Sequence, residues 1–293
     1  LTPKKMSWKT KLRIARGFRP VMLNTIRNII NPARGRALLS ETINRLVVRT
    51  REKASQVKDL KGILLAMEET AHMAPSFLLP HLLPGVVSGQ MPFQILLRLT
   101  EKDGLNPDLA YELMRGLKYN VTTEMDLKLW ATTCAIHEEA VSKEHFDAHS
   151  ASELADDYLT GVLPLVAQDA VKQFLDIYGC RGLGEIDIYK PRWQDDPSHV
   201  MQMIKNYLQI DPQTGSPEIA FSKGRERAVE ARRELMDIYK RKGSPLKAAL
   251  IGFLAGRAFE LAGLRETPKF AIVNFLAELR KAVLRIGDEL VAR

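Results

Sequence analysis

The sequence predicts an all-α protein, an irregular multi-helix bundle with a C-terminal helical hairpin. Apolar residues recur three and four positions apart along most of the 293 residues, which is the spacing of amphipathic helices. The alternation that marks a half-buried strand is scarce. A hydroxyl residue precedes proline at Ser244-Pro245 and Thr267-Pro268, and this pair indicates a helix start because the first helical position needs no N–H.

Helical spacing begins clearly at residues 37–73, where it continues for about ten turns with Gly62 inside it. This pattern predicts one long helix or two nearly collinear helices. Residues 74–92 contain four prolines, and since proline removes a backbone donor, we expect short helical turns and bends there. The remaining helices are expected at residues 93–101, 106–117, 121–139, 151–178, 197–209, 216–241, 245–262 and 268–291.

The last two helices are expected to pack against each other as the hairpin. The apolar positions of the first helix of the pair are Leu246, Leu250, Phe253, Leu254 and Leu261. Gly243 and Gly263 lie where helix ends favour a left-handed residue.

Residues 179–197, "GCRGLGEIDIYKPRWQDDP", are rich in glycine, proline and charge. This composition predicts a loop between helices, because "EIDIY" is too short to establish a sheet.

Composition excludes several classes of protein. With 45% hydrophobic and 27% charged residues the chain is typical of globular proteins, and its longest apolar stretch, residues 73–89, is interrupted by prolines and His81. We therefore expect no membrane span. The sequence opens without a secretory signal or an initiator Met, so we expect a piece of a longer cytoplasmic protein with Cys134 and Cys180 reduced.

Positive charge is concentrated in residues 1–55, which hold fourteen Lys or Arg against two Glu, a net charge of +12. A basic amphipathic helix can meet nucleic acid, anionic lipid or an acidic neighbouring domain. We favour a helical segment that packs on or near a domain outside this sequence. Residues 222–242 alternate in charge sign, which favours a solvated face over a nucleic-acid reader. Attachment to nucleic acid or membrane through residues 1–55 is the weakest of the interpretations, so neither is an expected partner.

Arg265, Glu266 and Lys269 gather two cations and a carboxylate where one helix ends and the next begins. The first turn of a helix has free N–H groups and a partial positive charge, so it favours an anion. The cations could stabilise a phosphoryl group, and Glu266 could accept the proton of an attacking hydroxyl. The alternative is an exposed turn in which Glu266 pairs with one of its neighbours.

Two further polar groups have structural explanations from their sequence. Thr122 or Thr123 can cap the helix that begins near residue 121, with Glu124 at its positive end. We expect a buried salt-bridge network that joins helices, formed by Arg181, Glu185, Asp187 and Arg192.

The histidines supply weak signals. His145 and His149 lie one turn apart with Asp147 between them, but no third ligand is evident, so no metal site is expected.

Three segments, "GLKYNVTTEMDLKLW", "FLDIYGCRGLGEIDIYKPRWQDDP" and "AGLRETPKFAIVNF", resemble the rifampicin phosphotransferases and their phosphoenolpyruvate synthase-like, dikinase-type relatives. The resemblance implies that an ATP-grasp domain uses ATP and Mg²⁺ to phosphorylate a histidine on a swivelling domain. That histidine then transfers the phosphoryl group to a hydroxyl of a ligand held in a helical domain. This chain resembles the helical substrate domain alone, so we expect it to bind ligand without turnover.

The resemblance also implies site residues. Arg265, Glu266 and Lys269 match the family's Arg-Glu-x-x-Lys turn, where phosphohistidine meets the substrate hydroxyl, and are therefore implied to be catalytic. The ligand is expected to be a large, apolar, hydroxylated small molecule, in the sharpest case a rifamycin-type antibiotic that phosphorylation inactivates. The expected substrate-binding residues are Met73, Phe77, Leu78, Leu82, Met91, Thr122, Glu124, Arg181 and Glu185.

Two alternatives stay open. The chain could be the substrate domain of a related phosphoenolpyruvate synthase-like or condensing enzyme. It could also be a helical binding module without catalysis.

Overall fold

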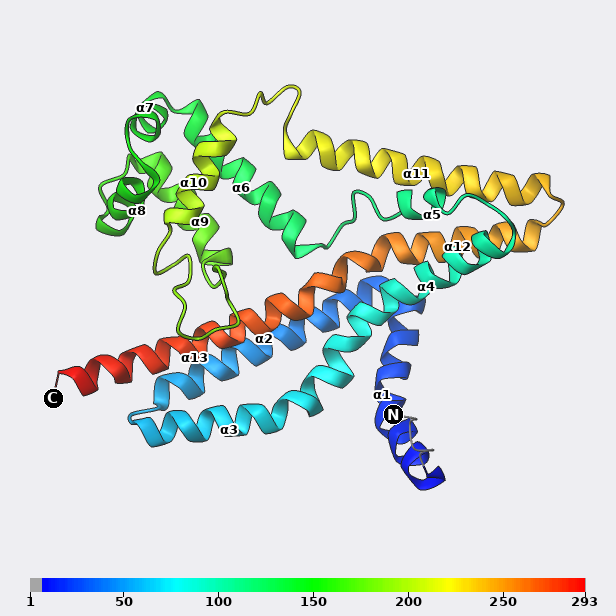
Figure 1. Ribbon diagram of the computed structural model, residues 1–293, viewed down its shortest axis with the longest axis horizontal. Helices are drawn as coiled ribbons and strands as arrows, with labels where there is room; N and C mark the ends of the chain where they lie inside the picture. The colour runs from blue at the N-terminus through cyan, green and yellow to red at the C-terminus, as the bar shows by residue number, and fades with distance from the viewer. Residues whose placement is uncertain (1–6, 293) are drawn as a thin grey trace, which may run out of the picture. The chain divides into compact units, whose positions relative to one another are not determined.

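The computed structural model describes residues 7–292, together with their side chains apart from those of residues 9–15, 67 and 70–79. Every regular element in this range is helical, which confirms the all-α prediction (Figure 1). None of the helices described is long and apolar enough to span a bilayer. The elements are α1 (Trp8–Ile30), α2 (Pro32–Gln56), α3 (Leu60–Phe77), η1 (Leu78–Leu82), α4 (Leu83–Lys102), α5 (Asp108–Glu112), α6 (Val121–Glu138), α7 (Ala140–Ala148), α8 (Ala151–Thr160), α9 (Leu165–Tyr178), α10 (Ser198–Leu208), α11 (Pro217–Arg241), α12 (Pro245–Leu261), η2 (Ala262–Glu266) and α13 (Thr267–Val291).

The chain divides into two compact units, each assembled from segments far apart in sequence. Unit 1 contains Leu1–Leu46, Leu64–Tyr119 and Ala228–Pro268. Unit 2 contains Val47–Ile63, Asn120–Arg227 and Lys269–Arg293.

The core of unit 1 forms where α4 packs against α12. Phe93, Leu96 and Leu97 of α4 are buried in one cluster with Ile251 and Leu254 of α12. Helix α4 thus covers the apolar face of α12, the role that the sequence analysis assigned to the last helix.

Three of the five apolar positions predicted for the hairpin in α12 are not buried. Leu246, Leu250 and Phe253 are exposed, so their predicted burial is wrong, whereas that of Leu254 and Leu261 is confirmed. The buried face carries mainly small residues, Ala248, Ala255 and Ala258 among them, which let another helix approach closely.

The proline-containing segment is helical throughout, contrary to the turns and bends that we predicted. Helix α3 runs into a π-helical turn, η1, and α4 begins directly after it. Pro84 falls in the first turn of α4, where a missing N–H leaves no bond unmade. Pro80 falls in the π-helical turn, one of the local rearrangements by which helices accommodate an interruption.

Several predicted helices end earlier than expected, because short breaks interrupt them. The long segment at 37–73 is two helices separated at residues 57–59, where the chain turns back (Figure 1). The segment at 151–178 breaks at Gly161, whose φ of 74° is left-handed. Gly243 is left-handed as predicted, but Gly263 is not, because the chain continues through the 3-10 turn η2 straight into α13.

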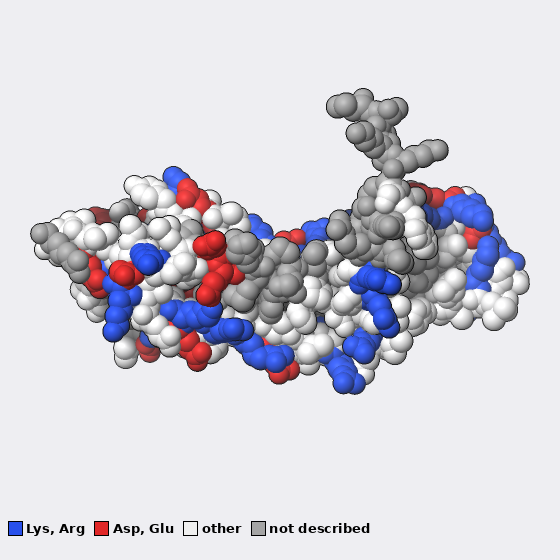
Figure 2. Space-filling view, turned by 90° about the horizontal axis from the view of Figure 1, so that it is seen from below, with Lys and Arg blue, Asp and Glu red and all other residues white. Residues whose placement is uncertain are grey.

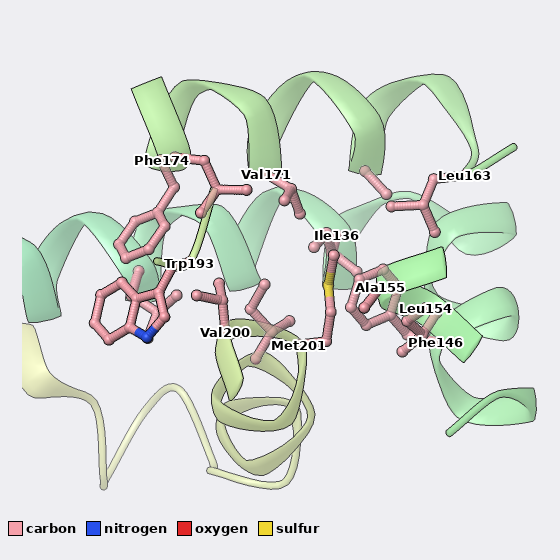
Figure 3. Close-up of a cluster of buried hydrophobic side chains, with 14 of the residues drawn as sticks. Ile136, Phe146, Leu154, Ala155, Leu163, Val171, Phe174, Trp193, Val200 and Met201 are labelled. Atoms are coloured by element: carbon pink, nitrogen blue, oxygen red, sulfur yellow. The ribbon is translucent and has the colours of Figure 1, made fainter. Parts of the chain in front are cut away.

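The core of unit 2 is formed by α6, α9 and α10 (Figure 3). Buried residues from these helices include Ile136, Val171 and Ile204. The predicted loop at residues 179–197 is confirmed, since it contains neither helix nor strand. It contributes Trp193 to the core, where the indole stacks on Phe174 with ring centroids 6.3 Å apart.

Basic side chains of residues 16–55 make individual contacts within each unit. In unit 1 the Arg36 guanidinium lies 4.1 Å from the centre of the Tyr119 ring. In unit 2 Arg51 pairs with Glu278 at 3.2 Å. On the face drawn in Figure 2, Lys and Arg side chains form separate groups, several of them beside Asp or Glu. The expected docking of residues 1–55 on a neighbouring domain stays a prediction.

Candidate functional site

In unit 1, Arg265 and Glu266 form the end of η2. The same turn contains Ala262, Gly263 and Leu264, which are all buried and hold it in place. Arg265 Nε donates to Glu266 Oε1 at 3.0 Å, and the Arg265 side chain is 60% exposed. A buried base therefore holds an exposed cation in contact with a half-buried carboxylate.

The close approach of α4 determines where this turn lies in unit 1. A Cβ on Gly89 would lie 2.5 Å from both N and Cα of Ala262, which is closer than atoms can pack. Glycine is therefore required at position 89 for η2 to rest on α4.

In unit 2, Lys269 lies in the first turn of α13 and pairs with a carboxylate of the 179–197 loop. Its Nζ is 3.0 Å from Glu185 Oε1. The other oxygen of Glu185 accepts from Arg181 Nε at 2.8 Å and from Gly182 N at 3.4 Å. Glu185 is only 6% exposed, whereas the Lys269 side chain is 54% exposed. A buried anion thus anchors a lysine whose ammonium group still reaches solvent.

Unit 2 has two more cations at the 179–197 loop: Arg192 lies within the loop, and Arg280 contacts it. Arg280 of α13 bonds Asp195 at 3.0 Å and donates from Nε to the Lys190 carbonyl at 3.0 Å. Arg192 is completely buried, and its three side-chain nitrogens have no hydrogen-bond partner within the described structure. Burial and then the charge of Arg280 lower the pKa of the Arg192 guanidinium.

The salt-bridge network predicted for the 179–197 loop is present in part. The Arg181–Glu185 pair forms as expected. Asp187 stays exposed and accepts only from the Tyr189 N–H at 2.9 Å among its hydrogen bonds described. Sequence reasoning missed Asp195 and Arg280, because their pairing joins positions far apart in the chain and no local pattern signals it.

The substrate-binding residues predicted near the prolines are placed as follows. The side chains of Met73, Phe77 and Leu78 lie outside the described residues. Leu82 is 2% exposed and belongs to the interior of unit 1, whereas Met91 on α4 is 38% exposed.

Thr122 and Glu124 lie in the first turn of α6, and both are exposed. The cap of this helix is Asn120, whose side chain accepts from the N–H groups of Thr122 and Thr123, so the prediction of a threonine cap is wrong. The amide side chain of Asn120 reaches both donors, which leaves the threonines inside the helix.

Unit 1 also contains a cavity of about 430 Å³ that the sequence analysis did not anticipate. Arg232 beside it donates from Nη2 to the Gly252 carbonyl at 2.8 Å. The spacing of Gly252 and Gly256 on α12 was the available signal, since these glycines leave room for Met236 and Arg232. Neither Arg265 nor Glu266 lines this cavity. Its walls are mostly apolar and consist of Leu113, Ala228, Val229, Arg232, Arg233, Met236, Ala255 and Phe259.

Comparison with known proteins identifies the family. A family model described as the rifampicin phosphotransferase fourth domain matches residues 81–266. A rifampicin phosphotransferase of Streptomyces sp is 33% identical over 181 residues, which are 59% of this chain and 20% of the relative. One of Bacillus subtilis (strain 168) is 27% identical over 187 residues, 62% of this chain and 21% of the relative.

A third relative is the prodigiosin synthesizing transferase PigC of Serratia marcescens, 34% identical over 94 residues, 30% of this chain and 10% of the relative. The chain spans about a fifth of the length of the curated rifampicin phosphotransferases that it matches. Since the family model matches more than half of the 293 residues, the chain belongs to the rifampicin phosphotransferase fourth-domain family.

Proposed function

We propose that this chain is the ligand-binding part of an ATP-dependent phosphotransferase whose substrate is a large, apolar, hydroxylated small molecule. A rifamycin-type antibiotic, inactivated by phosphorylation, is the sharpest form of the proposal. The observation that carries it is the family match over residues 81–266, which includes Arg265 and Glu266 at its end.

The proposed reaction moves a phosphoryl group from a histidine on another domain to the ligand. The ligand hydroxyl oxygen attacks phosphorus, so an O–P bond forms while the N–P bond to histidine breaks. Glu266 accepts the hydroxyl proton, and Arg265 and Lys269 stabilise the charge on the phosphoryl oxygens. The exposed Arg265–Glu266 contact in unit 1 and the anchored ammonium of Lys269 in unit 2 support these roles.

ATP and Mg²⁺ are proposed to act on domains outside this sequence, in a cytoplasmic protein. The matched part is about a fifth of each rifampicin phosphotransferase relative, so the rest of such a protein has room for an ATP-grasp domain and a phosphohistidine domain. By itself the chain should bind ligand without turnover.

The cavity in unit 1 supports an apolar ligand. Its volume of about 430 Å³ lies within the range of small-molecule pockets, which is roughly 300–1,000 Å³. Apolar surface buried there contributes about 25 cal/mol per Å². Arg232 and Arg233 add a few polar groups that could orient the ligand.

Isothermal titration calorimetry of the chain with rifampicin tests this proposal. We expect saturable binding, and we expect Val229→Trp to weaken it by at least about tenfold, because the indole would fill the cavity that Val229 lines. Leu246→Trp is the matched control, since Leu246 is 87% exposed and does not line the cavity.

Absence of binding to rifampicin and to other hydroxylated macrocycles would favour a helical module without catalysis. Binding that both tryptophan variants retain would place the ligand elsewhere in the chain.

A second candidate is the substrate domain of a synthesizing transferase. The similarity to the prodigiosin synthesizing transferase, 34% identity over 94 residues, favours it. Calorimetry with a prodigiosin precursor distinguishes the two candidates, because binding of the precursor in place of rifampicin would support the second.

A further inference from the structure

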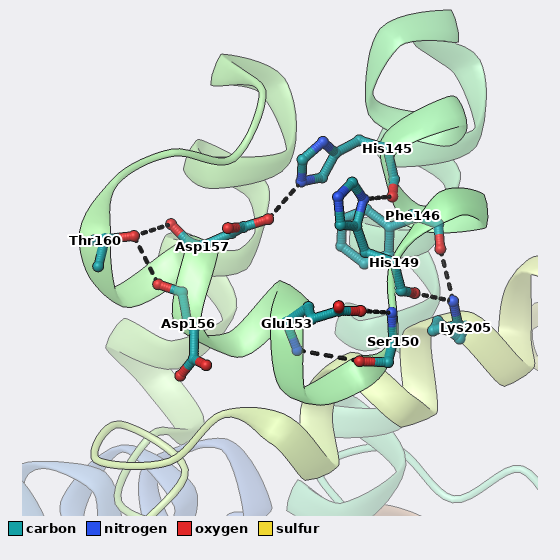
Figure 4. Close-up of polar contacts among 9 residues, drawn as sticks. All are labelled: His145, Phe146, His149, Ser150, Glu153, Asp156, Asp157, Thr160 and Lys205. Atoms are coloured by element: carbon teal, nitrogen blue, oxygen red, sulfur yellow. Dashed lines mark hydrogen bonds and ion pairs between the residues drawn. The ribbon is translucent and has the colours of Figure 1, made fainter.

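Two histidines and an aspartate converge between α7 and α8 in unit 2 (Figure 4). His145, His149 and Asp157 each offer one ligand atom, and these three atoms lie within 4.8 Å of one another. All three residues are partly buried. The aspartate comes from the last turn-and-a-half of α8, so two elements contribute to the cluster.

Asp157 is the third ligand that the sequence analysis did not find. Asp147, which lies between the histidines in sequence, instead pairs with Lys143 at 2.7 Å. His145 Nε2 lies 2.8 Å from Asp157 Oδ2. Because His145 and His149 lie one helical turn apart and the chain returns through α8, the donor atoms of all three residues lie in one cluster.

The hydrogen bond of His149 fixes its tautomer. Nδ1 of His149 lies 2.9 Å from the His145 carbonyl, and because a carbonyl oxygen only accepts, Nδ1 carries the proton. In the neutral ring this leaves the lone pair of Nε2 free to bind a metal ion. A backbone carbonyl that orients the second ring nitrogen is the usual support of a histidine ligand.

The backbone between the two helices is also held in place. Lys205 of α10 donates to the carbonyl of Phe146 at 2.7 Å and to that of His149. A capping box joins Ser150 and Glu153 at the start of α8. The ligands are therefore positioned by elements with their own contacts, which favours a preorganised site.

We propose that His145, His149 and Asp157 bind a divalent transition metal ion, with Zn²⁺ as the expected ion. Zinc accepts imidazole nitrogen and carboxylate oxygen at about 2.0–2.2 Å and commonly takes three protein ligands with a fourth position for water. The ion would replace the proton shared by His145 Nε2 and Asp157, and the side chains would draw together around it. This site is independent of the proposed phosphotransferase function.

Titration of the metal-free chain with Zn²⁺ tests the proposal. By calorimetry we expect about one equivalent to bind, with His149→Ala and Asp157→Asn each weakening the affinity on the order of 10²-fold. His137→Ala is the matched control, because His137 is exposed on α6 and outside the cluster.

NMR of the imidazole resonances in the unmodified chain provides a readout that does not depend on how the variants fold. We expect Zn²⁺ to shift the signals of His145 and His149 and to leave those of the other four histidines unchanged. The proposal is overturned if these two histidines do not respond, or if both ligand variants bind Zn²⁺ as tightly as the unmodified chain. In either case the contact between His145 and Asp157 serves only to join α7 to α8.

Discussion

Lys269 Nζ lies 3.0 Å from a carboxylate oxygen of Glu185, a side chain that is only 6% exposed. A lysine proposed to act in phosphoryl transfer is thus positioned by an anion of the 179–197 loop. In the proposed reaction Glu185 orients the Lys269 ammonium group, and its expected contact with the substrate stays a prediction.

Loss of the Glu185 charge should destabilise unit 2. Glu185→Gln keeps the size of the side chain but leaves Arg181 without its anion, so we expect the free energy of unfolding to fall by about 2 kcal/mol. Asp187→Asn in the same loop is the control, with an expected change below about 0.5 kcal/mol, because Asp187 is exposed. Urea unfolding followed by circular dichroism measures both, and equal effects would contradict the anchoring role.

Gly89→Ala should destabilise the chain although alanine favours helices. The gain in helix propensity is about 1 kcal/mol, but the new Cβ would lie 2.5 Å from the backbone of Ala262. Overpacking typically costs about 1–3 kcal/mol, and a backbone neighbour moves least, so we expect a net loss of at least about 1 kcal/mol.

Gly287→Ala in α13 provides the control for this change. A Cβ there meets nothing within 4 Å, so the substitution should be neutral or stabilising by up to about 1 kcal/mol. Thermal unfolding of the two variants should therefore shift in opposite directions; a stabilised Gly89→Ala variant would rule out the close crossing.

Stability should fall in alkaline solution because of Cys180. Burial raises the pKa of its thiol from 9.0 to about 11, so the unfolded chain loses the proton first as the pH rises. Between about pH 9 and pH 11 the folded state retains a proton that the unfolded state has lost, and the free energy of unfolding decreases.

The effect of Cys180 can be separated from that of other groups. Cys180→Ala should lose less stability than the unmodified chain between about pH 9 and pH 11, measured as the urea midpoint. Cys134→Ala is the comparison, since burial also raises the pKa of that thiol, without a shift as large. Indistinguishable pH profiles for Cys180→Ala and the unmodified chain would refute this origin.

The proposed catalytic cations should affect turnover more than ligand affinity. In a protein that joins this chain to ATP-grasp and phosphohistidine domains, Arg265→Ala and Lys269→Ala should each reduce kcat by about 10²-fold or more, because they remove charge contacts made in the transition state. The dissociation constant of the ligand should change little. Lys240→Ala, which removes an exposed cation paired with Asp237, is the control; unchanged turnover in the first two variants would exclude their assignment.

Features that depend on neighbouring residues could be predicted from the sequence. The all-α class follows from apolar spacing, the start of α12 from Ser244-Pro245, and the loop at 179–197 from its glycines and prolines. Each of these patterns acts within a few residues, so a single sequence contains the needed information.

Features that depend on distant partners could not be predicted. The burial of Leu246 depends on which helix packs against α12. Helix α4 packs against the face that carries small residues, because Gly89 permits a close approach. Asp195 pairs with Arg280, which lies 85 positions later in the sequence, and Asp157 reaches His145 only after α8 folds back. Such pairings are set by packing, for which the local sequence carries no pattern.

The contacts between the 179–197 loop and α13 limit how far the chain can be shortened from its C-terminal end. The family match ends at residue 266, ahead of Lys269 and Arg280, which fasten that loop through Glu185, Asp195 and the Lys190 carbonyl. A recombinant fragment limited to residues 81–266 would keep the loop but lose Lys269 and Arg280, the two residues that hold it. Proteases should then cleave between Arg181 and Trp193, so expression plasmids need to extend through the final helix.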